Sequence, residues 1–461
     1  MEDSVKKNIL DVFNSQKEYF NSYKMLNVKN RIEALKKLKK NIMIMLPKIY
    51  EALKIDLNKS ENEAYMTEVG IVLTEINYML KNIRSFARPK RVASPITQFH
   101  AKSYMIPSPY GSALIISPWN YPFMLSIDPL VDAISAGNSA VIKPSEISPH
   151  VSDVIKELID MTFERGHVDV VLGGVEECTE LLNLDFDYIF YTGSTRVGEI
   201  VMKHAAEHFT PVTLEMGGKS PCIVDETTNI ELTAKRIVFG KFLNCGQTCV
   251  APDYLYCHSS IKDKLVKEIE RQIVLQYTVD PIHNPDYPKM INIKQFNAMN
   301  SLIKEDNVIF GGKSDESSLK IEPTILESNF QADDMKNEIF GPILPVLTFE
   351  NLDEAIQNVK KLNPPLALYI FSSRKENQNK VINSIQFGGG CINDTIIHIA
   401  SNRLGFGGVK QSGIGTYHGK LGFDTFSHYK SIVDKKTWLD LPMRYQPYKK
   451  FNMKIVKWFL K

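Results

Sequence analysis

At 461 residues, with 43% apolar and 23% charged side chains, the chain has an ordinary globular composition and room for two or three domains. Its 55 basic and 53 acidic residues leave a formal charge of +2, which gives no general electrostatic attraction to nucleic acid. The six cysteines are scattered, so we expect free thiols in a reducing compartment rather than a disulfide framework.

The N-terminus has no recognisable sorting signal. Residues 1–7 are charged and then amphipathic, which is not the pattern of a secretion signal. No stretch holds the roughly 18 uninterrupted apolar residues that a membrane-spanning helix needs. We therefore expect a soluble, cytoplasmic protein.

The first part of the chain has helical periodicity. From residue 5 to residue 86, apolar side chains recur at helical spacing and predict core-facing stripes rather than sites. Prolines then bound an extended arm at residues 96–109. The stripes are Ile32, Leu35, Ile42, Leu46 and Ile49, followed by Val69, Leu73, Ile76, Leu80 and Ile83 on one predicted helix.

Two α/β regions follow the arm. Continuous apolar runs, typical of strands covered on both faces, alternate with helical stretches and predict a doubly wound parallel sheet. Strands are expected at 113–116, 139–142, 168–172 and 188–191, with helices at 123–136, 151–165 and 175–182. In the second region, strands are expected at 221–224, 255–257, 343–349, 366–371 and 390–393, with helices at 231–242, 261–275 and 352–361.

The end of the chain is glycine-rich and then basic. Residues 405–415 predict an ordered loop, because aromatic and charged residues interrupt the glycines. Residues 434–461 are strongly basic and end in Trp458, Phe459 and Leu460. This tail is either a terminal helix packed on the body or a segment resting on an anionic membrane surface.

Cys249 is the first candidate for chemistry. It follows Gln247 and Thr248 in a glycine-containing loop that ends at Pro252, an unusual place for an inert thiol. The alternative is a small core residue. A metal site at Cys245 and Cys249 is a weaker alternative, because the sequence nearby lacks the two further ligands that a structural zinc site usually shows.

Two polar residues beside predicted strands are candidate partners of that thiol. Asn120 lies in a turn after a strand, where its amide can donate to a developing oxyanion, although turn formation alone explains an asparagine there. Glu215 lies between a strand and two glycines. Apolar surroundings raise a carboxyl pKa and suit a general base, whereas a lone glutamate is usually a surface group.

A third group of residues suits a nucleotide. Lys143 and Glu146 follow a strand, where they can hold ribose hydroxyls, and Glu338 beside a Gly-Pro turn is a further candidate. Gly193 and Ser194 begin a helix, which favours an anion. An exposed charge pair and an ordinary turn are the rival explanations, and the dinucleotide fingerprint G-x-G-x-x-G is absent from the sequence.

Taken together, these motifs resemble the aldehyde dehydrogenase superfamily over nearly the whole chain and in the family's order. The ending, with residues 415–420 and 423–428, looks like the class 3 or fatty aldehyde branch. The resemblance implies an α/β aldehyde dehydrogenase-like fold. Its expected parts are a Rossmann-type cofactor domain (1–88 and 110–212), a catalytic domain (213–395), an oligomerisation arm (89–109 and 427–440), a glycine-rich loop region (396–426) and a basic tail (441–461).

The resemblance also implies a role for each candidate. Cys249 matches the nucleophile, Glu215 the general base and Asn120 the oxyanion donor. The implied cofactor residues are Lys143, Glu146 and Glu338 for ribose groups, Gly193 and Ser194 near the pyrophosphate, and Phe340 near the nicotinamide ribose. The implied cofactor is NAD, because Glu146 would repel an added phosphate, with NADP kept open.

The implied reaction is oxidation of an aldehyde to its carboxylic acid through a cysteine thiohemiacetal and thioester. A medium or long aliphatic, or an aromatic, aldehyde is the expected substrate, and a homodimer the expected assembly. His418 is as readily a structural hydrogen-bonding residue as a pocket residue. The implied pocket residues are Tyr121, Leu125, Phe239, Leu243, Thr248, Ile399, Phe406 and His418.

Two other functions remain open at this point. One is an acylating dehydrogenase that passes its thioester to coenzyme A, which has less need of Glu215. The other is a non-catalytic binding protein on the same fold, which would be expected to lose Cys249 or Glu215.

Overall fold

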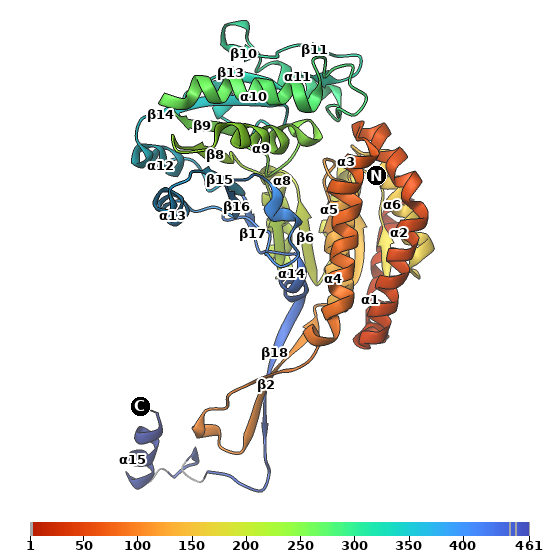
Figure 1. The fold of residues 1–461 in the computed structure, drawn as a ribbon. Coiled ribbons are helices and arrows are strands. Elements are labelled where there is room, and N and C mark those ends of the chain that lie inside the picture. Colours follow the sequence, from red (N-terminus) through yellow and green to blue (C-terminus); the bar gives the residue numbers. More distant parts are fainter. Residues whose placement is uncertain (1–2, 442–443, 448–449, 461) are drawn as a thin grey trace.

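The computed structural model describes residues 3–441, 444–447 and 450–460 (Figure 1). Its N-terminal part is helical, as predicted: α1 (Asp3–Asn21), α2 (Val28–Leu57), α3 (Glu61–Ala64) and α4 (Gly70–Phe86). The expected single helix through Val69 is interrupted, because Tyr65–Val69 forms the π-helical turn η2 between α3 and α4. The predicted stripes are buried, except that Leu46 and Leu80 are only half-buried.

Within the described residues, a six-stranded sheet follows the order β17-β7-β6-β3-β4-β5. Its neighbours are parallel except for the antiparallel pair of β17 and β7, which confirms the parallel arrangement predicted from the continuous apolar runs. The strands are β3 (Ser112–Ile116), β4 (Ser139–Lys143), β5 (Val168–Val170), β6 (Tyr188–Thr192), β7 (Val212–Glu215) and β17 (Gly413–Ile414).

Helices α5 (Met124–Ala136), α6 (Pro149–Thr162), α7 (Val175–Leu182) and α8 (Thr195–Glu207) connect these strands. β5 ends two residues earlier than expected and α6 three residues earlier, so the predicted lengths there were too long. The expected domain division between residues 212 and 213 falls inside β7.

Across the described chain, the larger sheet has seven strands in the order β10-β13-β14-β9-β8-β15-β16, with only β10 antiparallel to its neighbour. Its strands are β8 (Pro221–Val224), β9 (Tyr254–His258), β10 (Val308–Phe310), β13 (Thr324–Glu327), β14 (Ile343–Phe349), β15 (Ala367–Phe371) and β16 (Gly389–Ile392). Its helices are α9 (Ile230–Phe242), α10 (Lys262–Tyr277), α11 (Ile293–Asn300), α12 (Leu352–Lys360) and α13 (Lys375–Ser384). The short elements β10, β13, α11 and α13 were not predicted.

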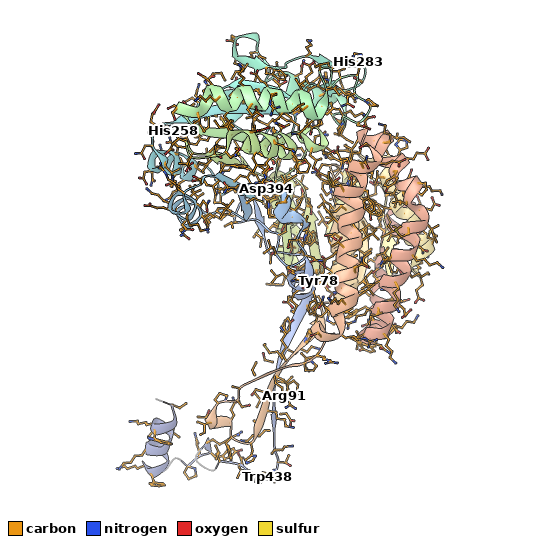
Figure 2. All side chains as sticks on the ribbon, in the orientation of Figure 1. Tyr78, Arg91, His258, His283, Asp394 and Trp438 are labelled. Atoms are coloured by element: carbon orange, nitrogen blue, oxygen red, sulfur yellow. The ribbon has the colours of Figure 1, made fainter. Side chains whose placement is uncertain are left out.

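An antiparallel arm projects from this body (Figure 1). It consists of β1 (Lys90–Val92), β2 (Ala101–Pro109) and β18 (Ser427–Lys435), and β18 pairs with β2 from Ser427 opposite Pro109 to Lys435 opposite Ala101. The short helix α14 (Gly419–Thr425) leads into β18. Figure 2 shows Arg91 and Trp438 out on the arm, away from the body.

The basic tail includes helix α15 (Lys450–Phe459) beyond the end of the arm, far from both large sheets in Figure 1. Its side chains Phe451 and Trp458 are exposed, so of the two alternatives for the tail, a terminal helix packed on the body is wrong for the described part. Residues 442–443, 448–449 and 461 of the predicted tail lie outside the described residues. Among the helices described, none is long and apolar enough to cross a membrane.

Candidate active site

A cavity of about 270 Å³ lies where the carboxyl ends of β3, β6 and β7 meet the segments that carry Cys249 and Glu338. A cavity at the carboxyl ends of parallel strands is where α/β folds place ligands. Nine of the predicted site residues line it: Asn120, Leu125, Gly193, Ser194, Glu215, Cys249, Glu338, Phe340 and Phe406. Pro118, Trp119, Thr192, Met216, Gly217 and Gln295 complete the lining.

The loop before Cys249 has an unusual backbone. Asn244, Cys245 and Gly246 all have positive φ, at 53°, 54° and 72°, which is costly for the two non-glycine residues. A Cβ on Gly246 would overlap the carbonyl of Gly341, so only glycine fits there. The loop is therefore held against the segment after Phe340.

The two cysteines of this loop have different environments. Cys245 is fully buried, with its Sγ 3.5 Å from the Tyr287 hydroxyl and 3.8 Å from the Met290 sulfur. Cys249 is only partly buried and lines the cavity. The alternative of an inert core cysteine therefore describes Cys245 and not Cys249.

The electrostatic surroundings of Cys249 keep its thiol protonated. Burial raises its pKa, and the carboxylates of Glu338 and Glu215 raise it further. The main-chain N–H groups of Cys249 and Val250 act in the opposite direction. A thiolate is the reactive form, so this site needs a group that takes the proton.

Glu215 is such a group. It ends β7, is 2% exposed, and neither of its carboxyl oxygens has a hydrogen-bond partner among the described residues. Burial raises the pKa of this carboxyl well above its ordinary value. An unpaired carboxyl at the wall of a cavity is free to exchange a proton with a molecule bound there.

Asn120 lies in the turn after β3 and is 3% exposed. Its Nδ2 donates to the carbonyl of Gln247 over 3.0 Å, two residues before Cys249. The main-chain carbonyl of Asn120 accepts from Asn244 Nδ2 at 2.8 Å and from Lys59 Nζ at 3.1 Å. A side-chain amide has two N–H donors, so one remains for a ligand in the cavity.

Two of the predicted ribose residues, Lys143 and Glu146, lie at and just after the end of β4 in the six-stranded sheet. Lys143 ends β4 with 3% of its side chain exposed, and its Nζ is 3.7 Å from the Glu146 carboxylate, which is 46% exposed. Lys143 also donates to the carbonyl of Pro144 at 2.8 Å. Neither Lys143 nor Glu146 lines the 270 Å³ cavity.

Gly193 and Ser194 join β6 to α8, as predicted, and the Ser194 hydroxyl caps that helix by accepting from the Val197 N–H at 3.4 Å. The preceding Thr192 has a buried hydroxyl without a hydrogen-bond partner among the described residues. Free main-chain donors at a helix start and an unpaired hydroxyl suit a polar, anionic ligand.

Glu338 and Phe340 lie in the loop before β14. Burial and Asp253 raise the pKa of Glu338 to about 8, while the Gly218 N–H, Lys219 and Lys241 oppose that shift. A Cβ on Gly217 would overlap the Glu338 carboxylate, so the two segments touch. Phe340 packs edge-on against Trp119 with 5.5 Å between ring centroids.

The eight predicted pocket residues do not form one wall. Leu125 and Phe406 line the cavity, and Tyr121 and Thr248 are joined beside it by a hydrogen bond. Leu243 lines a separate cavity of about 240 Å³ that also contains Glu63. Phe239 and Ile399 pack against the core, and His418 is buried with its Nε2 3.5 Å from Asp128.

Sequence reasoning missed several lining residues. Trp119 and Thr192 sit directly beside predicted residues, so proximity in sequence was an available signal. Gln295 comes from α11, a helix that was not predicted, and nothing in its local sequence marks it.

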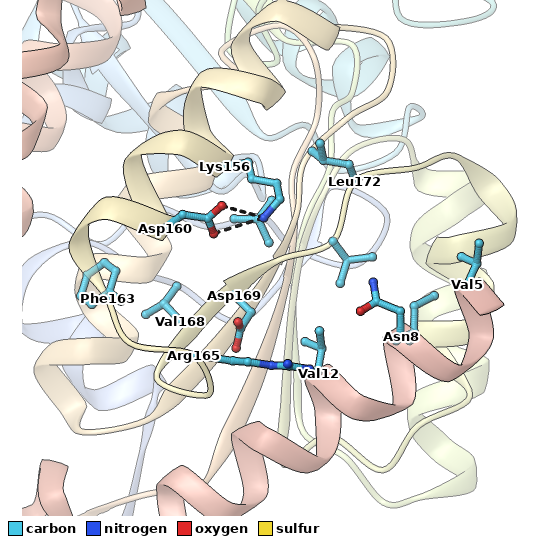
Figure 3. A pocket seen from close by; sticks show the side chains of 13 residues that line it. Val5, Asn8, Val12, Lys156, Asp160, Phe163, Arg165, Val168, Asp169 and Leu172 are labelled. Carbon is cyan, nitrogen blue, oxygen red and sulfur yellow. Dashed lines mark hydrogen bonds and ion pairs between the residues drawn. The ribbon is translucent and has the colours of Figure 1, made fainter.

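A larger cavity of about 490 Å³ lies elsewhere, between α1, α6 and β5 (Figure 3). Its lining combines apolar side chains such as Val5 and Val12 with the ion pair of Lys156 and Asp160. It contains none of the predicted site residues, so size does not identify the site. Among the described residues, no group of three or more His, Cys, Asp or Glu side chains is arranged to hold a metal ion.

The chain is similar to known proteins over nearly its whole length. A family model described as the aldehyde dehydrogenase family matches residues 1–432. A 4,4'-diaponeurosporen-aldehyde dehydrogenase of Staphylococcus aureus is 48% identical over 453 residues, covering 97% of this chain and 98% of that protein. Aldehyde dehydrogenase family 3 member A2 of Mus musculus is 40% identical over 447 residues, and the alignment covers 96% of this chain and 92% of that protein. The substrate-bound structure of Staphylococcus aureus AldH superposes with a TM-score of 0.97 at 47% identity, covering 98% of this chain and 99% of that one.

Proposed function

The chain belongs to the aldehyde dehydrogenase family, in its class 3 branch, and we propose that it oxidises medium or long apolar aldehydes at Cys249. It is an NAD(P)-dependent enzyme that converts aldehydes to carboxylic acids. One observation carries the proposed assignment of residues: Cys249, Glu215 and Asn120 come from three separate segments and line one cavity. A thiol, a carboxyl and an amide donor are the groups that this chemistry requires.

The first step is addition of the Cys249 sulfur to the aldehyde carbonyl. Glu215, whose carboxyl is unpaired, accepts the thiol proton directly or through one water. The carbonyl oxygen becomes the oxyanion of a thiohemiacetal. The free N–H of Asn120 and the main-chain N–H of Cys249 stabilise that charge.

The residues around the carboxyl ends of β4 and β6, together with Glu338, fit a nicotinamide dinucleotide. The unpaired hydroxyl of Thr192, the start of α8 and the Lys143 ammonium are donors for phosphate and ribose oxygens, and Glu338 is an acceptor for ribose hydroxyls. When bound, the cofactor supplies the hydride acceptor. Phe340 and Trp119 wall that side of the cavity and limit the entry of water.

The last step is hydrolysis of the thioester at Cys249. Glu215 first releases the thiol proton to solvent. Water then attacks the carbonyl carbon of the thioester, Glu215 takes a proton from that water, and the C–S bond breaks, which releases the carboxylic acid and the Cys249 thiolate. Because burial raises the pKa of Glu215, its ionised form is a stronger base than an ordinary glutamate carboxylate.

The apolar walls support the proposed substrate class. Leu125, Phe406 and Phe340 line the cavity and offer no charge to a ligand on that side. The name of the Staphylococcus aureus relative, which specifies a diaponeurosporen aldehyde, also supports a long apolar substrate.

The test is cofactor reduction followed by absorbance with aldehydes from acetaldehyde to dodecanal and with benzaldehyde. We expect kcat/KM to rise with chain length and activity to vanish in Cys249→Ala. Activity restricted to acetaldehyde would reject the proposed substrate class. No oxidation of any aldehyde, together with NADH-dependent reduction of an acyl-CoA, would support the acylating alternative.

We also propose a homodimer and the domain division expected from the sequence. The arm of β1, β2 and β18 projects from the body, and β18 is exposed along most of its length. A second copy of this chain could pack against the exposed arm and bury it. Light scattering on a size-exclusion column would give twice the monomer mass. A cytoplasmic location stays a prediction.

The basic tail supports a weak peripheral contact with anionic membranes. Exposed Phe451 and Trp458 on α15 accompany Lys450, Lys454 and Lys457. Sedimentation with phosphatidylserine vesicles should pull down part of the full chain and none of a chain that ends at Leu441. Equal sedimentation of the two would reject the contact.

A further inference from the structure

We propose that Lys59 and Glu68 form a buried ion pair that positions the oxyanion donor Asn120. The inference rests on the proposed function of Asn120 and adds two positioning residues from the N-terminal helical region: Lys59 in the loop between α2 and α3, and Glu68 in η2. Their sequence pattern had indicated only core packing.

The pair is fully buried. Lys59 Nζ lies 2.6 Å from Glu68 Oε1, and both side chains are 0% exposed. A buried ion pair is weak evidence for stability, because desolvation of the two charges offsets their attraction. Its hydrogen bonds to the rest of the chain therefore indicate what it does.

Those hydrogen bonds hold both ends of one short turn. Lys59 Nζ donates to the carbonyl of Asn120 at 3.1 Å. Glu68 Oε2 accepts from the N–H of Phe123 at 2.9 Å and from that of Met124 at 3.1 Å. Because α5 begins at Met124, these N–H groups have no partner within the helix, and Glu68 provides one.

Glu68 lies in the π-helical turn η2. Thr67, Glu68 and Val69 are consecutive there and all three are buried, so this turn is covered on more than one face. A turn of π-helix widens the helix locally and is frequent at functional sites. Here it directs a carboxylate inward between Lys59 and the start of α5.

The same pair also reaches the neighbour of Asn120. Lys59 Nζ lies 4.0 Å from the ring centroid of Tyr121, whose hydroxyl is 2.6 Å from that of Thr248. Asn120 itself donates to Gln247. The ion pair thus holds the backbone of the turn, while the side chains of Asn120 and Tyr121 form hydrogen bonds with the loop that carries Cys249.

The consequence is control of where the Asn120 amide points. Misplacement of a catalytic donor by about 1 Å can cost about 100-fold in rate. Loss of the pair should therefore lower kcat, because oxyanion stabilisation acts on the reaction steps. It should leave the cofactor affinity unchanged, since Lys143 and Glu338 lie on other segments.

The first experiment compares Glu68→Gln with the parent and with Asp56→Asn. Asp56 is a matched control, because it is a buried carboxylate that accepts from the Val151 N–H at the start of α6, at 3.0 Å, away from the cavity. We expect kcat to fall by about 10- to 100-fold in Glu68→Gln only. The NAD dissociation constant, measured by fluorescence titration, should stay within about twofold in both variants.

The decisive experiment is a double-mutant cycle with Asn120→Ala. If Glu68 acts through Asn120, then Glu68→Gln should lower kcat by less than about twofold in the Asn120→Ala background. An equal loss in both backgrounds would overturn the positioning role and leave the proposed function intact. A parental rate in Asn120→Ala alone would overturn the oxyanion role, and with it this inference.

Glu68→Asp serves if Glu68→Gln does not fold. It keeps the charge, but it is one methylene shorter and cannot reach both Lys59 and the start of α5. It should lower kcat in the parent background and have little effect beside Asn120→Ala. Parental kcat in folded Glu68→Asp would overturn the inference.

Discussion

The hydroxyl of Tyr121 lies 2.6 Å from the hydroxyl of Thr248, and both groups are buried. The two residues are 127 positions apart, yet each is the direct sequence neighbour of a proposed catalytic residue, Asn120 or Cys249. Among the described residues, this hydrogen bond is one of three that link the turn of the oxyanion donor to the loop of the nucleophile, together with those of Asn120 to Gln247 and of Asn244 to Asn120.

Tyr121→Phe should lower kcat by about fivefold, because the lost hydrogen bond is worth about 1 kcal/mol. Tyr188→Phe is the matched control, since the Tyr188 hydroxyl in β6 makes a comparable buried hydrogen bond of 2.7 Å to the Thr213 hydroxyl in β7. Both variants should lose similar stability in urea unfolding. Equal losses of kcat in the two would show that the Tyr121 bond has no special role.

The two cysteines of the loop should respond differently to alanine. Cys249→Ala should lower aldehyde oxidation by about 1,000-fold or more, because the nucleophile is lost. Cys245→Ala should keep kcat and lose about 1 kcal/mol of stability, because it leaves a small void beside Tyr287 and Met290. Steady-state rates and thermal unfolding separate these effects. A fully active Cys249→Ala would reject the assignment.

Glu215→Gln should slow turnover by about 100-fold or more, because hydrolysis of the thioester loses its base. Stopped-flow absorbance would show whether reduced cofactor still forms in a burst of one equivalent per site. A burst followed by a stall is expected if the substitution slows hydrolysis more than it slows addition of the thiol. Unchanged steady-state turnover would exclude Glu215 as the base.

The raised pKa of Glu215 also has a consequence for stability. The folded state holds this proton to a higher pH than the unfolded state, whose glutamate pKa is about 4.3. The free energy of unfolding therefore falls as pH rises above that value. Glu215→Gln should remove this penalty, so its stability relative to the parent should be greater at pH 8 than at pH 5. Urea unfolding at both pH values checks the sign.

Gly217→Ala should raise KM for NAD by about tenfold, as expected when a charge-assisted hydrogen bond is lost. The added Cβ would overlap the Glu338 carboxylate and displace it. KM for the aldehyde should change little. In a Glu338→Gln background the same substitution should add little, and a full tenfold increase there would show that it acts elsewhere.

Much of the fold could be predicted from local sequence patterns. β14 begins and ends at the predicted residues 343–349, and α7 at 175–182, because continuous apolar runs and helical periodicity record local burial. The short elements β10 and β13 and the π-helical turn η2 were missed. Few residues and weak periodicity define such elements, and packing decides their geometry.

The sequence by itself determined the chemistry that this protein carries: a thiol at Cys249, a carboxyl at Glu215 and an amide at Asn120, each beside glycine, proline or a strand end. Only the tertiary structure decided which side chains meet. It put Leu243 in a separate cavity, brought Gln295 to the candidate site, and joined Lys59 and Glu68 beneath Asn120. Chemical identity and local conformation are properties of neighbouring residues, whereas contacts between distant residues arise only when the chain packs.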